Sequence, residues 1–262
     1  MKIRGLVVPT ITPLKDGAVD THSLSKLLEF LISGGADAIF IIGTTGEFQY
    51  LPYAQKQKII KQANDIIGHQ VPLLVGISAE DPREIMALAG EAEDNSAQAI
   101  VLAPMFGQGE PAKKMESVIQ NSSLPVLLYN NPEIHRGELL PPEIVKEYSV
   151  NPRVIGIKDS SGNWDYFTRL LKLQSEIFSI LQGKESSILQ ALVAGANGIV
   201  PGTANVDPRL FARILVSQDE QTMQEIMNFK DELKRLDEEP ISAIKQKLVQ
   251  LGIIISAETG KL

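Results

Sequence analysis

Short runs of apolar residues return eight times along the chain, and segments with helical periodicity separate them. The runs are nearly continuous in Val, Ile and Leu, which is typical of parallel strands that are covered on both faces. This alternation predicts an α/β protein. The predicted strands are residues 6–9, 38–42, 72–77, 99–103, 125–129, 154–158, 178–182 and 198–200.

The segments between these strands carry helix signals. Residues 24–31 place leucines at the spacing of one helix face. Asp81 before Pro82, and Asp207 before Pro208, each offer an N-cap followed by proline at the first helical position. Both the helices and their start points therefore support a regular strand–helix repeat.

Eight such units in 262 residues suit a closed (β/α)8 barrel, and an open doubly wound sheet is the alternative. Residues 207–217 complete the last barrel helix, and further helices are expected near 219–239 and 242–251. No segment has the composition of a linker. The sequence predicts one barrel over residues 1–217, with C-terminal helices over residues 218–262 packed on it.

Composition excludes several classes of function. The chain has no cysteine, which rules out disulfides, thiolate zinc sites and a cysteine nucleophile. The formal net charge is −7 and no basic cluster is present, which argues against a nucleic-acid partner. No apolar run approaches the roughly 20 residues of a membrane span, so we expect no membrane partner and a cytoplasmic location.

Active sites of (β/α)8 barrels lie at the carboxyl ends of the strands, where Lys158 is the most informative residue. A neutral lysine attacks carbonyl groups and forms Schiff bases, and burial favours the neutral amine. A strand-terminal lysine that extends into solvent is the alternative interpretation.

Two other strand ends carry candidate groups. Residues 43–47 read Gly-Thr-Thr-Gly-Glu and offer backbone N–H groups and hydroxyls to an anion, although an ordinary turn also explains them. Tyr129 ends another strand and places a phenol where it could move protons, or it is simply a core residue. Together with Lys158 they describe a site for a 2-keto acid: the carboxylate at Thr44 and Thr45, and the keto carbon at Lys158.

Other residues give weaker signals. His22, His69 and His135 lack the spacing of metal ligands and are expected at the surface. Trp164 is expected to be a packing residue. We predict no metal and no organic cofactor.

The combination resembles the dihydrodipicolinate synthase / N-acetylneuraminate lyase family of pyruvate-dependent class I aldolases. The resemblance covers nearly the whole chain, in several motifs that occur in the family's order. The motifs are residues 5–14, residues 43–47, Tyr129-Asn130-Asn131-Pro132, Gly156-Ile157-Lys158-Asp159 and residues 202–206. It implies a (β/α)8 barrel with a C-terminal helical extension, and a homo-oligomer, either tetramer or dimer.

The resemblance also implies roles for single residues. Lys158, Tyr129 and Thr44 would be the catalytic residues: Lys158 would form the Schiff base with the 2-keto acid, and Tyr129 would carry protons. Thr44 and Thr45 would hold the carboxylate through hydroxyl and backbone N–H groups, and Gly202 would offer a backbone carbonyl near the imine. The remaining predicted substrate-binding residues follow other strands: Gly43, Asn131, Gly183, Glu185 and Thr203.

Two positions depart from the synthase pattern. Phe106 stands where the synthases carry a second tyrosine, and Ile134 stands where they carry an arginine for the semialdehyde carboxylate. Arg136, two residues further on, replaces that arginine only if the loop is rearranged. We therefore expect a lyase that cleaves or forms a C–C bond to pyruvate, with a 2-keto-3-deoxy sugar acid as substrate.

The alternative within the family is 4-hydroxy-tetrahydrodipicolinate synthase, which condenses pyruvate with aspartate semialdehyde. An alternative of another class is a barrel that binds a 2-keto acid or sugar acid without catalysis. A phosphate-binding barrel enzyme would need a glycine-rich anion site after the seventh and eighth strands, and it is less well supported because Glu185 would repel phosphate there.

Overall fold

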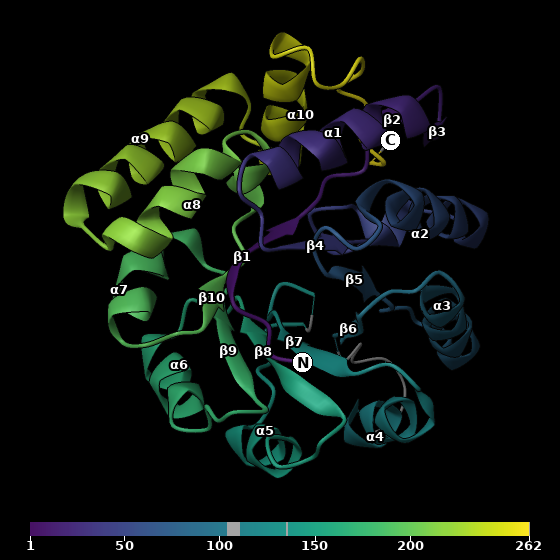
Figure 1. Cartoon of the computed structure of the whole chain (residues 1–262), viewed down its shortest axis with the longest axis vertical. Helices are drawn as coiled ribbons and strands as arrows, with labels where there is room; N and C mark the ends of the chain where they lie inside the picture. The colour runs from purple at the N-terminus through teal and green to yellow at the C-terminus, as the bar shows by residue number, and fades with distance from the viewer. Residues whose placement is uncertain (104–110, 135, 262) are drawn as a thin grey trace.

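Eight parallel strands close into a barrel in the computed structural model, which describes residues 1–103, 111–134 and 136–261 (Figure 1). Strand β1 pairs with both β10 and β4, so the sheet has no free edge. The predicted (β/α)8 barrel is confirmed, and the open-sheet alternative is wrong. The barrel strands are β1 (Gly5–Pro9), β4 (Ala38–Ile41), β5 (Leu73–Gly76), β6 (Ala99–Leu102), β7 (Val126–Asn130), β8 (Val154–Asp159), β9 (Ser179–Gln182) and β10 (Gly198–Ile199).

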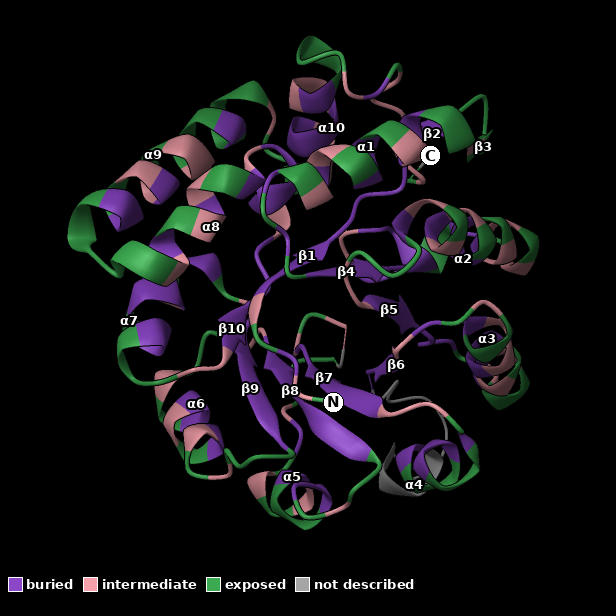
Figure 2. Ribbon diagram, in the orientation of Figure 1, coloured by how far each residue is buried: buried purple, intermediate pink, exposed green. Residues whose placement is uncertain are grey.

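Helices surround the barrel and turn their apolar faces toward it, as the buried and exposed stripes in Figure 2 show. The Asp81 side chain accepts a hydrogen bond from the Arg83 N–H, and Asp207 accepts one from the Leu210 N–H. Both predicted N-caps are therefore confirmed. The helices are α1 (Thr21–Ser33), α2 (Tyr53–Ile67), α3 (Pro82–Asp94), α4 (Pro111–Asn121), α5 (Pro142–Tyr148), α6 (Trp164–Leu171), α7 (Ile188–Val193) and α8 (Pro208–Ser217).

A small antiparallel hairpin lies outside the barrel and was not expected from the sequence. It consists of β2 (Leu14–Lys15) and β3 (Ala18–Val19). Asp16 and Gly17 join the strands with φ of 53° and 74°, the left-handed geometry that Asp-Gly favours in a two-residue turn. The hairpin is short, so its apolar pattern is too brief to be recognised by periodicity.

Two further helices, α9 (Glu220–Leu236) and α10 (Pro240–Gln250), follow the barrel, close to the predicted positions. Helix α9 packs against α8 and α10. The division of the chain at residue 217 remains our proposal. Among the described residues, no helix has the length and apolar character needed to cross a membrane.

Side chains fill the inside of the barrel, as they do in folds of this kind. Phe40, Leu127 and Leu181 belong to this inner cluster and are almost fully buried. A second, larger apolar cluster lies between the strands and the surrounding helices.

Candidate active site

A cavity of about 680 Å³ opens at the carboxyl ends of the barrel strands. Its inner wall consists of strand ends and the loops that follow them, and its outer wall comes from α9, α10 and the residues between them. Nine of the ten predicted site residues line it: Thr44, Thr45, Tyr129, Asn131, Lys158, Gly183, Glu185, Gly202 and Thr203.

Gly43 is the exception, since the structure does not place it in the cavity wall. A Cβ at this position would lie 2.8 Å from the Phe40 ring, so glycine allows the chain to pass over the ring. The binding role of Gly43 stays a prediction, and the structure adds this packing role.

An extra residue in β8 directs Lys158 into the barrel. Ile155 stands between the two β8 positions that pair with Val126 and Leu127 of β7, which makes a β-bulge. Ile155 and Lys158 both face the inside, whereas Ile157 belongs to the outer cluster. Strict alternation from Ile155 would have turned Lys158 outward, so the bulge re-aims this side chain.

Lys158 lies directly against an aromatic wall. Its Nζ is 4.1 Å from the centre of the Tyr129 ring and 5.3 Å from that of Phe40. The two rings meet edge to face at 6.4 Å. Only 4% of Lys158 is exposed, so the alternative of a lysine extending into solvent is wrong. Gly183 leaves room for this side chain, because a Cβ there would lie 3.0 Å from the Lys158 Cε.

The Tyr129 hydroxyl is surrounded by polar groups. The Asn131 side-chain amide donates to it at 2.9 Å, and the Thr44 hydroxyl lies 3.4 Å away. Burial alone would raise the pKa of Tyr129, but the Lys158 charge and hydrogen bonds with Thr44, Ser160 and Lys158 outweigh burial and lower this pKa. The phenol is therefore prepared to lose or return a proton beside the lysine amine.

The loop of residues 43–47 is a tight turn between two residues in the left-handed region. Ile42 has a φ of 57° and Glu47 a φ of 59°, and a β-branched residue rarely adopts this conformation. Backbone strain of this kind is common at binding sites. The Glu47 N–H closes the turn onto the Thr44 carbonyl at 3.0 Å. Thr44 and Thr45 lie at the crest of this turn and line the cavity.

A fixed carboxylate forms another part of the wall. Glu185 Oε1 accepts hydrogen bonds from the Thr203 N–H at 2.9 Å and from its hydroxyl at 3.0 Å. Lys230 of α9 places its Nζ 3.8 Å from Glu185 Oε2. The Gly202 carbonyl accepts a hydrogen bond from the Asn205 side chain at 2.7 Å. Glu185 is held in one orientation and offers acceptors to hydroxyl or ammonium groups of a substrate.

Sequence reasoning missed the contribution of the C-terminal helices. Lys230 and Lys234 of α9 line the cavity, as do Lys184 and Ser160. Lys184 and Ser160 stand beside predicted residues at strand ends, so position could have found them. No local signal shows that α9 extends over the barrel mouth, because that depends on tertiary packing.

The positions that depart from the synthase pattern are only partly visible. Phe106 and His135 lie outside the described residues. Ile134 packs against the apolar cluster inside the barrel, and Arg136 is exposed and does not line the cavity. The described part of this loop thus does not bring Arg136 into the cavity.

The remaining sequence interpretations concern packing. Trp164 stacks on Phe167 with 5.7 Å between the ring centres, which confirms a packing role. His22 and His69 are exposed, as expected. Within the described ranges, no group of three or more His, Asp or Glu residues is arranged to hold a metal ion.

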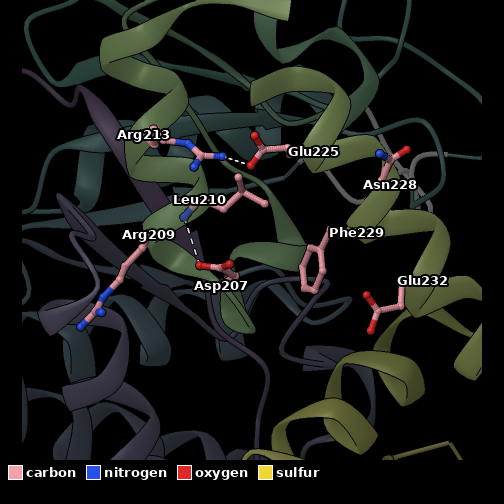
Figure 3. A pocket seen from close by; sticks show the side chains of 8 residues that line it. All are labelled: Asp207, Arg209, Leu210, Arg213, Glu225, Asn228, Phe229 and Glu232. Atoms are coloured by element: carbon pink, nitrogen blue, oxygen red, sulfur yellow. Dashed lines mark hydrogen bonds and ion pairs between the residues drawn. The ribbon is translucent and has the colours of Figure 1, made fainter. Parts of the chain in front are cut away.

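A second cavity lies on the outside of the barrel between α8 and α9 (Figure 3). Arg213 and Glu225 form an ion pair across it, and Phe229 of α9 also lines it. It shares no lining residue with the barrel-mouth cavity. This second cavity is lined by neither a lysine nor a tyrosine, whereas Lys158 and Tyr129 line the first. We therefore place the chemistry at the barrel mouth.

A buried amine beside a phenol, at the mouth of a parallel barrel, has the chemical equipment of a Schiff-base aldolase. The Dihydrodipicolinate synthetase family matches residues 2–257, and the chain belongs to this family. Its members are pyruvate-dependent class I aldolases, so this chain is a carbon–carbon lyase of that type, not a barrel that only binds. The family forms its Schiff base between a lysine and pyruvate without a metal.

Named relatives agree with this membership. The 4-hydroxy-tetrahydrodipicolinate synthase of Persephonella marina is 31% identical over 209 residues, which cover 78% of this chain and 71% of the relative. The dihydrodipicolinate synthase of Bacteroides thetaiotaomicron has a TM-score of 0.91 at 31% identity, over 99% of this chain and 93% of its own. The Acinetobacter baumannii enzyme, solved with pyruvate, has a TM-score of 0.88 at 26% identity, over 100% and 93%.

Proposed function

We propose that Lys158 is the Schiff-base lysine and that the chain condenses pyruvate with aspartate semialdehyde. The observation that carries the first part is the Lys158 amine, buried against Tyr129 in a cavity at the strand ends. The second part is supported by relatives that are named 4-hydroxy-tetrahydrodipicolinate synthase. Their names favour this alternative over the sugar-acid cleavage expected from the sequence.

The proposed reaction begins when the Lys158 amine attacks the keto carbon of pyruvate. The carbinolamine loses water to give a protonated imine, which withdraws electrons from the neighbouring methyl carbon. Loss of a proton from that carbon gives an enamine, whose carbon attacks the aldehyde. The aldehyde oxygen takes up a proton to become a hydroxyl. The α-amino group of the former semialdehyde then attacks the imine carbon and displaces the Lys158 amine, which closes the ring of the product and regenerates the free lysine.

Tyr129 is the proposed proton carrier in these steps. Its hydroxyl lies beside the amine. Its pKa is lowered from the ordinary value toward neutral pH, which favours proton exchange. Asn131 donates to the hydroxyl and fixes its direction. Thr44 and Thr45 are proposed to hold the pyruvate carboxylate with hydroxyl and backbone N–H groups.

Cleavage of a 2-keto-3-deoxy sugar acid is a second candidate, and a specific observation favours it. The carboxylate of Glu185, fixed by Thr203, is suited to the hydroxyls of a sugar-derived aldehyde. Ile134 supplies no charge for a semialdehyde carboxylate, and Arg136 is exposed. For an anionic acceptor the described cavity offers Lys184, Lys230 and Lys234 instead.

Both reactions, assayed on the same preparation of the protein, distinguish the two candidates. We expect kcat/KM for condensation of pyruvate with aspartate semialdehyde to exceed that for pyruvate release from 2-keto-3-deoxygluconate. A missing charge-assisted hydrogen bond changes such a ratio by roughly 10- to 150-fold, so the comparison has sufficient range. If sugar-acid cleavage is faster by roughly tenfold or more, the synthase assignment is wrong and the second candidate stands.

We also propose that the chain assembles into a homo-oligomer, a dimer or tetramer, and acts in the cytoplasm on a small 2-keto acid. Related structures include a dihydrodipicolinate synthase variant described as monomeric, so the assembly needs its own measurement. Light scattering should give a mass that is a multiple of the 28.6 kDa protomer. A single protomer mass at micromolar concentration would contradict the proposal.

A further inference from the structure

Glu47 is the residue of the 43–47 loop whose side chain does not face the cavity. It is 2% exposed and is not part of the cavity wall, although Thr44 and Thr45 beside it are. An acidic side chain buried next to a site for an anion needs a structural reason, because an unpaired buried charge is costly.

Both carboxylate oxygens of Glu47 have partners from a distant part of the chain. Lys245 of α10 forms an ion pair with Oε2, and the Gly260 N–H donates to Oε1 at 2.8 Å. The Lys245 amine also donates to the Glu258 carbonyl at 2.6 Å. The side chains of Lys245 and Glu47 are 0% and 3% exposed. The pair thus joins the loop, α10 and the residues after α10 in one buried contact.

The segment after α10 is itself fixed in place. Glu258 pairs with Leu14 of the β2–β3 hairpin, and its side chain accepts from the Gly17 N–H at 2.8 Å. A Cβ on Gly260 would lie 2.7 Å from the Cβ of Tyr50, so glycine permits the close approach to the loop. Residues 258–260 therefore form a rigid support behind Glu47.

Stability alone does not account for this contact. Burial lowers the pKa of Lys245, and the charge and hydrogen bond of Glu47 oppose that shift only in part. Buried ion pairs of this kind often add little to folding, since apolar side chains of similar volume serve as well. A charged, directional contact does fix the position of its partners, and Glu47 is joined through its own N–H to the Thr44 carbonyl at 3.0 Å.

We propose that Lys245 and residues 258–260 act through Glu47 as positioning residues for the carboxylate-binding pair Thr44 and Thr45. Thr12 completes the support, because its hydroxyl donates to the Gly46 carbonyl at 2.7 Å. These contacts hold the loop on the side away from the cavity, while Thr44 and Thr45 face the substrate. This inference rests on the proposed role of Thr44 and Thr45 in binding pyruvate, and it does not depend on the identity of the aldehyde.

The test compares two ketones that differ in one charge. Pyruvate and its neutral methyl ester both offer a ketone to Lys158, and borohydride reduces either imine irreversibly. In the Glu47→Gln, Lys245→Met double variant, which leaves no unpaired charge, the pyruvate concentration for half-maximal inactivation should rise roughly tenfold. The value for methyl pyruvate should stay within about twofold, because it needs no carboxylate site.

Two further variants complete the experiment. Lys247→Met on the same helix removes an exposed ion pair with Glu232 and should leave both values unchanged. Gly260→Ala keeps the backbone N–H but adds a methyl group that would lie 2.7 Å from the Tyr50 Cβ, so it should displace this N–H from Glu47 and also raise the pyruvate value selectively. If the double variant does not fold, Gly260→Ala alone tests whether the contacts of Glu47 position the loop. Circular dichroism melts establish that each variant is folded.

The outcomes separate this inference from the proposed function. Equal shifts for both ketones would show that the contact is merely structural, and an unchanged pyruvate value would show that the loop supports itself. Either result overturns the inference. Failure of pyruvate to label Lys158 in the unmodified protein would instead overturn the proposed function, and an unaltered pyruvate value in Thr45→Val would overturn the proposed binding role of the Thr45 hydroxyl.

Discussion

Two buried tyrosines show how their surroundings change the same side chain. Tyr166 donates to the Leu140 carbonyl, and burial raises its pKa far above the ordinary value. Tyr129 is buried to nearly the same extent, but the charge of Lys158 and its polar neighbours lower its pKa. The difference in charge environment, not burial, supports the proposal that Tyr129 is the reactive residue.

Lys158 gives the most direct prediction. Borohydride with pyruvate should label the protein at Lys158, and Lys158→Ala should abolish both labelling and turnover. The protein should remain folded, since single substitutions of this kind usually change the free energy of unfolding by about 0.5–3 kcal/mol. Peptide mass mapping locates the label, and Lys172→Ala at the exposed end of α6 is the control. Labelling elsewhere would contradict the assignment.

Tyr129→Phe keeps the ring and removes only the phenol. Loss of a general acid–base group typically lowers the rate by about 100- to 10,000-fold. Since the pKa of Tyr129 is below its ordinary value of 10.0, the phenol loses its proton earlier as the pH rises. We therefore expect kcat/KM to fall on the alkaline side below pH 10, and the residual activity of Tyr129→Phe to lack that fall.

Tyr166→Phe is the matched control for Tyr129→Phe. It also removes a buried hydroxyl, so it should cost about 1 kcal/mol of stability, yet leave kcat, kcat/KM and the pH dependence of kcat/KM unaltered. If both variants have the same effect on kcat, Tyr129 is a packing residue.

The bulge in β8 is the element on which the site depends. Gly156, the residue after the extra Ile155, has a φ of 153°, and a Cβ on it would lie 2.3 Å from the Ser179 carbonyl oxygen. The bulge therefore needs glycine for two reasons: the backbone angle and the close approach of β9. The bulge sets the direction in which the side chain of Lys158, two residues after Gly156, points.

Gly156→Ala should disturb this element and the site together. Strain and overpacking should lower the free energy of unfolding by about 1–3 kcal/mol, and kcat should fall because Lys158 moves. Chemical denaturation and steady-state kinetics measure both. Gly90→Ala in α3 is the control: nothing lies within 4 Å of its Cβ, so it should gain about 0.5–1 kcal/mol, as alanine does in helices. A fully active Gly156→Ala protein would show that the bulge tolerates a side chain.

The sequence predicted the repeating elements because their patterns are local. Apolar runs and Asp-Pro caps identified the strands and helix starts, and strand ends pointed to Lys158 and Tyr129. The bulge was missed, although a glycine inside a strand is a known signal for one. The cavity wall from α9, and the partners of Glu47, could not be predicted, since they join residues about 200 positions apart.

At the scale of the whole molecule, the barrel is a closed sheet, whereas the helices that cover its mouth depend on acidic caps as well as on apolar packing. Ile226 of α9 and Leu248 of α10 belong to the larger apolar cluster around the strands. The covering helices begin at polar contacts: Asp219 caps α9 through the Thr222 N–H, and Asp237 accepts from the Ser242 hydroxyl of α10. We therefore expect the two parts to differ in their response to acid.

The covering helices should loosen first as the pH falls. The Thr222 N–H lowers the pKa of Asp219, and the Ser242 hydroxyl lowers that of Asp237, both from 3.8. Groups with a lowered pKa stabilise the fold above 3.8 and lose this contribution as the pH falls through their folded pKa. Hydrogen exchange should therefore accelerate over residues 219–250 below about pH 4, before the barrel strands.

Asp219→Asn tests the cause of this acid response. Asparagine caps a helix as well as aspartate does but does not titrate, so the pH dependence of exchange at the start of α9 should be weaker. An identical pH dependence in this variant would mean that other groups control the loosening.

The extra residue in β8 has a consequence for protein design. A barrel drawn with perfect alternation would send Asp159 into the cavity and Lys158 into the outer apolar layer, or would place hydrophobic residues at both positions. The second choice would fold well and melt at a high temperature. A selection for expression or thermal stability would accept it, although it holds no nucleophile. Designs based on this fold therefore need the irregularity written into the backbone before side chains are chosen.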